Sequence, residues 1–213
     1  MNSDDPFAEA ISGEAKTYDL TQSIDDLKAA GLKIKGETQL EASDQGLKFK
    51  YRSNEEDKKW PTITLPAKGA KDFDFKVDFA DLKISDAKEW GCSMDLRIKF
   101  DDPEKSVITV GIRQDKSNDM TVLAQRAYDP PEGKRSYEKF KLKAPFDKGS
   151  FRMVRRDGKV YCLATGDGKV QSVIASFTIG QRSVSEFSAI ARSASDSTEL
   201  DVVLTGLSLK LEK

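Results

Sequence analysis

The chain has 213 residues, and its 35 basic and 36 acidic side chains leave a formal net charge of −1. The two signs are interleaved along the chain, which argues against a nucleic-acid-binding face and against adhesion to an anionic membrane. This length is typical of one large all-β domain or two small ones, and it suffices to bury a core without metals or disulfides. No apolar run approaches the roughly 20 residues of a transmembrane helix, so we expect no membrane span.

Histidine is absent from the chain. Its absence excludes a Ser-His-Asp or Cys-His mechanism within the chain and removes the commonest general base and zinc ligand. The two cysteines, Cys92 and Cys162, are too few for a disulfide scaffold. Either they form one bridge, or both are buried as small apolar residues.

The N-terminal region predicts a tail and one short helix. Residues 1–17 are polar and aperiodic, so we expect a flexible tail before a single domain over residues 18–213. The tail lacks the basic and apolar regions of a signal peptide, so we expect either a cytoplasmic protein or an extracytoplasmic one whose leader was removed. In SIDDLKAAG, Ser23 and Asp26 can form a capping box, and Gly31 can end the helix.

Alternating apolar and polar residues dominate the rest of the chain. This period of two predicts antiparallel strands with one buried and one solvated face, and it is clear in GLKFKYRS (46–53), DFDFKVDF (72–79) and SMDLRIKF (93–100). SVITVGIR (106–113) has apolar residues on both faces, which predicts a strand covered on both sides. Residues 129–149 predict a surface excursion with a short strand around 137–142. About ten to thirteen strands in all indicate an antiparallel sandwich or barrel.

The stretch FRMVRRDGKVYCLATGDG (151–168) predicts a β-hairpin. Asp157-Gly158 suits a type I′ turn, because both central residues of that turn need positive φ. One face of this hairpin, with Phe151, Met153 and Cys162, then points into the core. The opposite face is half apolar, so a loop, a ligand or a partner should cover it; it carries Arg152, Val154, Tyr161 and Leu163.

The last strand changes phase. Leucine and valine residues occupy even positions from 200 to 204 and odd positions from 207 to 211. Because a strand has a period of two, one residue must be inserted between these runs. We predict a β-bulge at Gly206, or alternatively a break into two strands.

Three stretches resemble a known group of proteins. The hairpin resembles that of concanavalin A-like and laminin G-like jelly-roll domains, in which a similar stretch runs x-R-hydrophobic-x-R-x-G-x-x-Y. Four residues lie near those places: Arg152, Arg155, Gly158 and Tyr161. ITLPAKGAKDFDFKVDF and the ending FSAIARSASDSTELDVVLTGLSLKLEK resemble strands of secreted bacterial domains of unknown function with this fold. The resemblance covers residues 30–212 and implies an all-β, two-sheet antiparallel jelly-roll sandwich in an extracytoplasmic setting. It implies no defined activity.

Catalytic and metal sites have little support in the sequence. Jelly-roll glycanases carry carboxylates at alternate positions of one strand, where one can act as nucleophile and another as acid. Glu199 and Asp201 lack a third acid, and Lys76 interrupts a set of aspartates at 72, 74 and 78. We therefore expect no enzyme and no cofactor, with a glycoside hydrolase-like enzyme as the weaker alternative. A structural calcium is conceivable at loop acids, namely Asp101, Asp102, Asp115, Asp119 and Asp167.

Carbohydrate binding needs aromatic faces for stacking and planar polar groups for hydroxyls. Tyr161 and Arg152 share a hairpin face, Trp60 and Trp90 lie near strand ends, and Arg97 lies on the outward face of its strand. Each also has a plainer interpretation as a packing or solvated residue. We predict Tyr161, Arg152, Trp90 and Arg97 as ligand-binding residues of a non-catalytic binding or adhesion module for carbohydrate. The alternative is a structural or protein-interaction domain that uses the half-apolar hairpin face, and the oligomeric state is left open.

Overall fold

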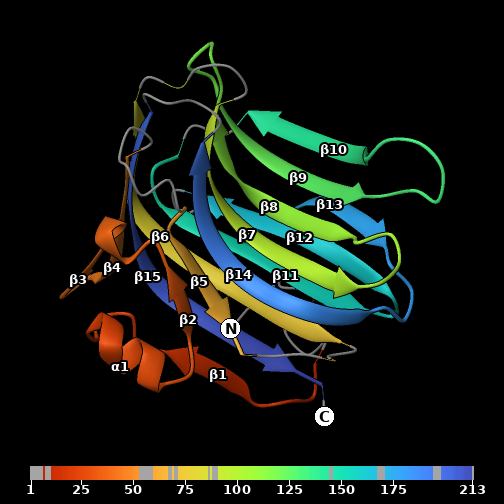
Figure 1. Cartoon of the computed structure of the whole chain (residues 1–213), viewed down its shortest axis with the longest axis horizontal. Coiled ribbons are helices and arrows are strands. Elements are labelled where there is room, and N and C mark those ends of the chain that lie inside the picture. Colours follow the sequence, from red (N-terminus) through yellow and green to blue (C-terminus); the bar gives the residue numbers. More distant parts are fainter. Residues whose placement is uncertain are drawn as a thin grey trace.

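The computed structural model describes residues 7, 11–52, 60–66, 69, 72–85, 87, 91–143, 146–166, 171–193 and 198–212. These residues form fifteen strands, one α-helix, α1 (Ile24–Ala29), and one 3-10 turn, η1 (Glu37–Gln39). The strands pair antiparallel in two sheets that lie face to face (Figure 1). The predicted two-sheet antiparallel jelly-roll sandwich with one short helix is confirmed.

The larger sheet has eight strands. Its spatial order is β13 (Ser172–Thr178), β12 (Lys159–Gly166), β11 (Gly149–Arg156), β6 (Phe73–Ser85), β15 (Glu199–Leu211), β4 (Gly46–Arg52) and β3 (Leu40–Ser43). The eighth strand, β1 (Ala15–Tyr18), pairs with residues 207–210 of β15. The last strand of the chain, β15, therefore lies inside this sheet and pairs with both β1 and β4.

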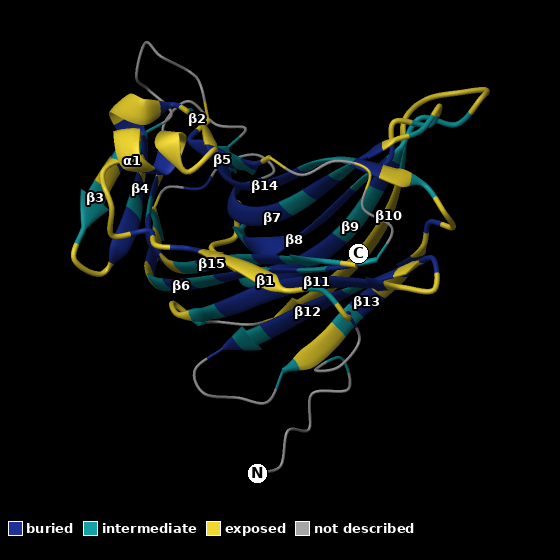
Figure 2. Cartoon of the chain, turned by 90° about the horizontal axis from the view of Figure 1, so that it is seen from below, coloured by how far each residue is buried: buried dark blue, intermediate teal, exposed yellow. Residues whose placement is uncertain are grey.

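The smaller sheet has seven strands. Its spatial order is β10 (Ser136–Lys143), β9 (Met120–Tyr128), β8 (Val107–Gln114), β7 (Cys92–Asp101), β14 (Ser183–Ser193), β5 (Thr62–Leu65) and β2 (Lys33–Lys35). In Figure 2 this sheet is curved, with β2 and β10 rising on either side of its middle strands. Its outer face, which points away from the other sheet, is therefore concave.

The core lies between the sheets and contains the residues that alternation placed inward. None of the following is more than 4% exposed: Leu47, Phe49, Tyr51, Phe73, Phe75, Val77, Phe79, Met94, Leu96, Ile98 and Phe100. In Figure 2 the middle strands of both sheets are mostly buried, and exposed ribbon gathers on α1 and β13. The burial of so much apolar surface is the main stabilising contribution to such a sandwich.

Both cysteines belong to this core. Cys92 and Cys162 are free thiols with no exposed surface, so the disulfide interpretation is wrong and the buried one is confirmed. Burial raises the pKa of the Cys92 thiol to about 12, with a further contribution from the negative charge of Asp95. Burial also raises the pKa of Cys162. Both side chains therefore act as small apolar residues.

The helix caps agree with the sequence, but the expected tail boundary does not. The Ser23 hydroxyl accepts a hydrogen bond from the Asp26 N–H at 3.2 Å and donates one to its carboxylate at 2.6 Å, and Gly31 follows the helix with a φ of 95°. Residues 15–17, which we expected in a flexible tail, instead begin β1, and Ile11 is 3% exposed. The sequence misses β1 because three of its four residues are exposed, so no alternation marks it.

The hairpin and the bulge form as predicted. Asp157 and Gly158 have φ values of 52° and 72°, and the register pairs Met153 with Cys162 and Val154 with Tyr161. In β15 the pairing with β6 shifts between Leu204 and Gly206, so the strand continues with its apolar face restored. The bulge therefore reconciles the two phases of the final strand without a break.

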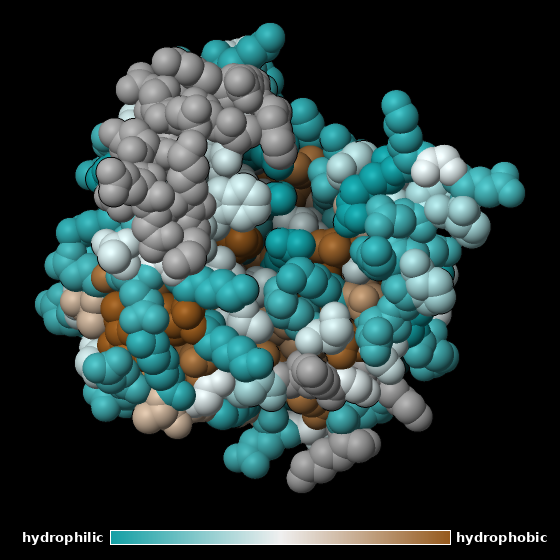
Figure 3. Space-filling model, in the orientation of Figure 1, coloured by the Kyte–Doolittle hydropathy of each residue, from teal (hydrophilic) through white to brown (hydrophobic). Residues whose placement is uncertain are grey.

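Within the described residues, no helix has the length and apolar character that crossing a membrane requires. Hydrophilic residues cover most of the described surface seen in Figure 3.

Candidate functional site

The structure separates the predicted site residues. Arg152 in β11 and Tyr161 in β12 lie together on the outer face of the eight-stranded sheet, as the hairpin register requires. Arg97 in β7 lies on the outer face of the other sheet. Trp90 lies outside the described residues. The three described residues therefore do not form one site.

The chain itself covers the hairpin face around Tyr161. The Phe7 ring lies 4.9 Å from the Tyr161 ring, centroid to centroid, and Val154 and Leu163 are at most 1% exposed. Arg152 donates two hydrogen bonds to the Asp74 carboxylate, at 2.8 and 2.6 Å, and one to the Phe7 carbonyl at 3.4 Å. This face has the paired charges and ring packing of a structural surface.

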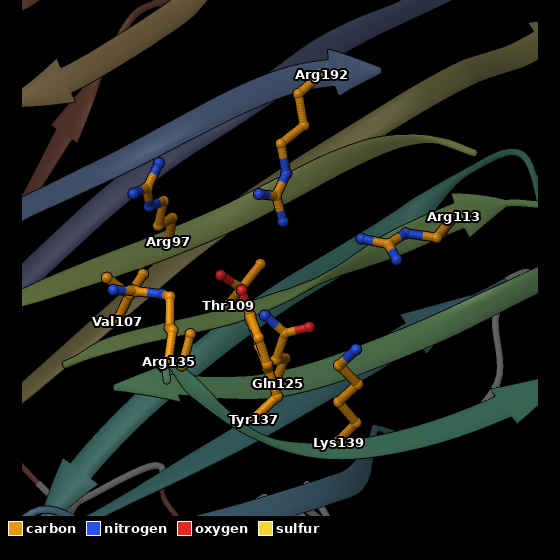
Figure 4. Close-up of a pocket in the computed structure, with 10 residues that line it drawn as sticks. Arg97, Val107, Thr109, Arg113, Gln125, Arg135, Tyr137, Lys139 and Arg192 are labelled. Atoms are coloured by element: carbon orange, nitrogen blue, oxygen red, sulfur yellow. The ribbon is translucent and has the colours of Figure 1, made fainter. Parts of the chain in front are cut away.

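A cleft of about 490 Å³ occupies the concave face of the seven-stranded sheet. Its cationic side chains come from β7, β8, β10, β14 and the segment before β10; they are Arg97, Arg113, Arg135, Lys139 and Arg192. Figure 4 shows Arg113, Arg192 and Lys139 extending toward one space from three strands, with Gln125 beneath them. The chain thus brings five cations together on a molecule whose net charge is −1.

Strand register sets one straight row of polar residues across this cleft. Arg97 in β7 lies opposite Thr109 in β8, and Thr109 lies opposite Gln125 in β9. Gln125 in turn lies opposite Lys139 in β10. Neighbouring strands are about 4.8 Å apart, so the row spans about 14 Å. It offers hydrogen-bonding groups at regular intervals along the concave face.

Beside this row, the carboxylate of Asp95 is buried and does not line the cleft. We expected Asp95 on a solvated face, but it is 1% exposed; it accepts hydrogen bonds from Arg192 Nε at 2.6 Å and from the Ser93 hydroxyl at 3.0 Å. The opposite residue in β8 is Gly111, and a Cβ there would clash with Asp95 Oδ1 and the Met94 carbonyl oxygen. The missing side chain of Gly111 therefore makes room for the Asp95 carboxylate.

Three guanidinium groups surround this one carboxylate. Arg192 pairs with Asp95 directly, whereas neither the Arg97 nor the Arg113 guanidinium has a hydrogen bond or ion pair with any described residue. Burial and the positive charge of Arg192 lower the pKa of both Arg97 and Arg113. An arginine still keeps its proton under these conditions. The cleft therefore holds positive charge that the described residues do not balance.

Aromatic side chains stand on both sides of Arg97. Tyr137 is 52% exposed in the main cleft, where Lys139 Nζ lies 4.8 Å from its ring centroid. An adjoining hollow of about 370 Å³ also contains Arg97, together with Trp60, which is 40% exposed. Polar groups flanked by exposed aromatic rings are the combination that we expected of a carbohydrate site.

The acids considered for catalysis lie elsewhere and are paired. Asp201 and Glu199 contact Arg52 at 2.9 and 3.5 Å on the outer face of the eight-stranded sheet. On the same face Asp74 pairs with Arg152. None of the described residues that line the main cleft is an aspartate or a glutamate. In the adjoining hollow, Glu186 pairs with Lys99 at 2.9 Å.

Two of the loop acids considered for calcium cap turns. Asp102 Oδ1 accepts a hydrogen bond from the Ser106 N–H, and Asp115 Oδ1 accepts one from the Ser117 N–H. Asp167 lies outside the described residues. In the described part of the chain, no three acids or cysteines gather where they could hold a metal ion.

Solved structures with the same fold come from several kinds of protein. A kappa-carrageenase from Pseudoalteromonas carrageenovora, in complex with an oligotetrasaccharide of kappa-carrageenan, has a TM-score of 0.65, 9% identity and 99% coverage of both chains. A legume lectin-like domain from Entamoeba histolytica has a TM-score of 0.60 and 12% identity, and the match covers 93% of this chain and 97% of that one. The carbohydrate-binding module CBM66 from Bacillus subtilis reaches 0.50 with 13% identity, over 84% of this chain and 95% of that one.

At these identities the likeness shows the fold alone, which is that of the concanavalin A-like jelly-roll sandwiches. A comparison with curated protein sequences gives no match. A family model matches residues 12–213, which is nearly the whole chain, and its description is "Protein of unknown function (DUF1583) C domain". The chain therefore belongs to the family of DUF1583 C domains.

Proposed function

We propose that this domain is a non-catalytic module that binds carbohydrate along the concave face of the seven-stranded sheet. The observation that carries the proposal is the polar row from Arg97 to Lys139 with exposed Tyr137 and Trp60 beside it. Aromatic rings can stack on sugar faces while the amide of Gln125 and the arginine side chains reach the hydroxyl groups. Of the three described residues among the four predicted from the sequence, Arg97 belongs to this surface, and Arg152 and Tyr161 lie on the other sheet.

Proteins of similar fold support a role with carbohydrate. They include a legume lectin-like domain and a carbohydrate-binding module, and also a carrageenase in complex with an oligotetrasaccharide. Binding modules and glycan-cleaving enzymes thus share this fold, so the fold alone does not decide between them. The choice between binding and hydrolysis therefore depends on the side chains in the cleft.

The charges of the cleft favour binding over hydrolysis. Glycosidases generally place two carboxyl groups about 5–9.5 Å apart around the scissile bond. Here the described lining of the main cleft is cationic, Asp95 is buried beneath Arg192, and Glu186 is held by Lys99. We therefore keep a glycoside hydrolase as the weaker alternative. The extracytoplasmic setting implied by the family resemblance remains a prediction.

A glycan array tests this proposal with a matched pair of variants. Tyr137→Ala removes the exposed ring of the cleft, and Tyr161→Ala removes a ring of the hairpin face that Phe7 covers. We expect the wild type and Tyr161→Ala to bind the same glycans, and Tyr137→Ala to bind them about tenfold more weakly. Binding that depends on Tyr161 and not on Tyr137 would contradict the proposed surface.

A protein-interaction role is the second candidate, and one edge of the sandwich favours it. Phe140 and Leu142 in β10 are 48% and 51% exposed, and Val173 in β13 is 51% exposed. β10 and β13 end the two sheets at the same side, where Phe140 lies 5.9 Å from Phe177 of β13, centroid to centroid. Self-association that Phe140→Ser abolishes, together with no glycan binding, would favour this role.

A further inference from the structure

We propose that the ligand is an acidic polysaccharide whose sulfate or carboxylate groups bind Arg97 and Arg113. This inference rests on the proposed function and specifies the class of glycan that the concave face accepts. It is based on the charges of the cleft, on the partial burial of these two guanidinium groups without a described carboxylate partner, and on the length of the polar row.

The charges of the cleft can be assigned pair by pair. Arg192 is neutralised by Asp95 at 2.6 Å, and Arg135 is neutralised by Asp129, also at 2.6 Å. Arg97, Arg113 and Lys139 remain without a carboxylate partner among the described residues. A bound anion would supply the missing negative charge.

Arg97 and Arg113 have the burial and, among the described residues, the free hydrogen-bond donors that suit anion binding. Both are partly buried, and Arg97 Nε is shielded from solvent without any hydrogen-bond partner among the described residues. Removing a guanidinium from water without pairing it is unfavourable, and the nearby Arg192 adds repulsion, which is why burial and charge lower the pKa of both groups. The planar guanidinium fork matches the oxygens of a carboxylate or a sulfate.

The shape of the site favours a chain of sugars over a small anion. A single anion would occupy one end of the cleft, but the polar row extends about 14 Å across four strands. Arg97 also lines the adjoining hollow that contains Trp60, so the concave face continues beyond the row. Repeated acidic groups along one polymer could therefore contact cations at several points of this face.

Nucleic acid is a poorer fit for the same charges. Its binding usually requires a broad basic face, whereas an acidic residue, Asp129, pairs with Arg135 of this cleft. The whole chain also carries a net charge of −1. We therefore assign the site to acidic glycans and use DNA as a competing probe.

Affinity electrophoresis with two matched pairs of polysaccharides tests the inference. The pairs are kappa-carrageenan with its desulfated form and polygalacturonate with its methyl ester. Within each pair only the acidic group differs. We expect retardation by at least one acidic member, much weaker retardation by its neutral counterpart, and binding that weakens as salt rises. The acidic member that binds identifies the group as sulfate or carboxylate.

A double variant links this binding to the two arginines. Arg97→Gln with Arg113→Gln removes two charges from the cleft, and we expect binding about 100-fold weaker. The control is Lys48→Gln with Lys50→Gln, which removes two charges from the outer face of β4 in the other sheet and leaves binding unchanged. Thermal unfolding of both variants tests whether they are folded, and we expect cooperative transitions for both.

The outcomes distinguish failure of the acidic-ligand inference from failure of the carbohydrate-binding function. Equal binding of acidic and neutral glycans that still depends on Tyr137 would overturn the acidic ligand and keep the carbohydrate function. Binding of double-stranded DNA as tight as that of the acidic glycans, or full binding by the double arginine variant, would also overturn the inference. No binding to any polysaccharide or array glycan would overturn both.

Discussion

The two outer faces of the sandwich carry similar residues in opposite arrangements. On the eight-stranded sheet, Arg152 is held by Asp74, and Arg52 is held by Asp201. On the seven-stranded sheet, Arg97 and Arg113 are partly buried and have no carboxylate partner among the described residues. Arg152 and Arg52 of one face are thus paired with carboxylates, whereas two arginines of the other face carry positive charge without such a partner in the described part of the chain.

This difference indicates different roles for the two faces. A partly buried cation without a partner lowers stability, and such groups persist where binding requires them. A cation in a two-point pair with a carboxylate contributes to stability and has few donors left for a ligand. Exposed charge alone would not separate the faces, because arginine occurs on both.

The largest expected effect on stability comes from replacing the buried Asp95 beneath the concave face. Asp95→Asn removes the carboxylate that pairs with Arg192 and whose negative charge also acts on Arg97 and Arg113, and we expect the free energy of unfolding to fall by about 3 kcal/mol. Urea denaturation measures this loss. Asp129→Asn breaks the more exposed pair with Arg135 and should cost less than about 1 kcal/mol. Equal losses of stability in the two variants would mean that Asp95 does not stabilise the group of arginines around it.

The second test breaks the pair of Arg152 with Asp74 on the outer face of the eight-stranded sheet. Arg152→Gln removes two hydrogen bonds to Asp74, so we expect a loss of about 2 kcal/mol in the free energy of unfolding. Glycan binding should not change, because this arginine lies on the opposite sheet. Lost glycan binding in a folded Arg152→Gln protein would reverse the assignment of the two faces.

A smaller effect is expected where the chain covers its own hairpin. Phe7→Ala removes the ring that lies 4.9 Å from Tyr161, and ring pairs of this kind contribute about 1 kcal/mol. We expect that loss in urea denaturation and no change in glycan binding. A gain in glycan binding would instead show that Phe7 blocks a site on this face.

The smallest effect has the opposite sign. Arg97→Gln removes a buried, unpartnered Nε and a charge that Arg192 repels, so we expect stability to rise by about 0.5 kcal/mol. Binding of acidic polysaccharide should weaken in the same variant. A clear loss of stability would show that Arg97 has a structural role after all.

Local chemistry made the sandwich and its hairpin predictable. Asp157-Gly158 encodes its turn because both residues must take positive φ, and the register of β11 and β12 follows directly from that turn. Alternation likewise identified the inner faces of β4, β6 and β7. Such patterns work because each lies within one or two neighbouring strands.

The cleft could not be predicted in the same way. β14 pairs with β7, so Arg192 reaches Asp95, which is 97 residues away in the sequence. Alternation correctly placed Asp95 on the outward face, but its burial depends on Gly111 in the next strand and on Arg192 above it. The weak signal in the sequence was the mixed pattern of β8, whose Thr109 is buried on the concave face.

Arginine side-chain NMR signals test the central claim most directly. The Nε–Hε resonances of isotope-labelled protein can be assigned by single substitutions and followed during titration with a kappa-carrageenan or galacturonate oligosaccharide, whichever polymer retards the protein. We predict shifts for Arg97, Arg113 and Arg192 on the concave face, and no shifts for Arg152 and Arg155 of β11. Shifts confined to Arg152, or none at saturating oligosaccharide, would contradict the account.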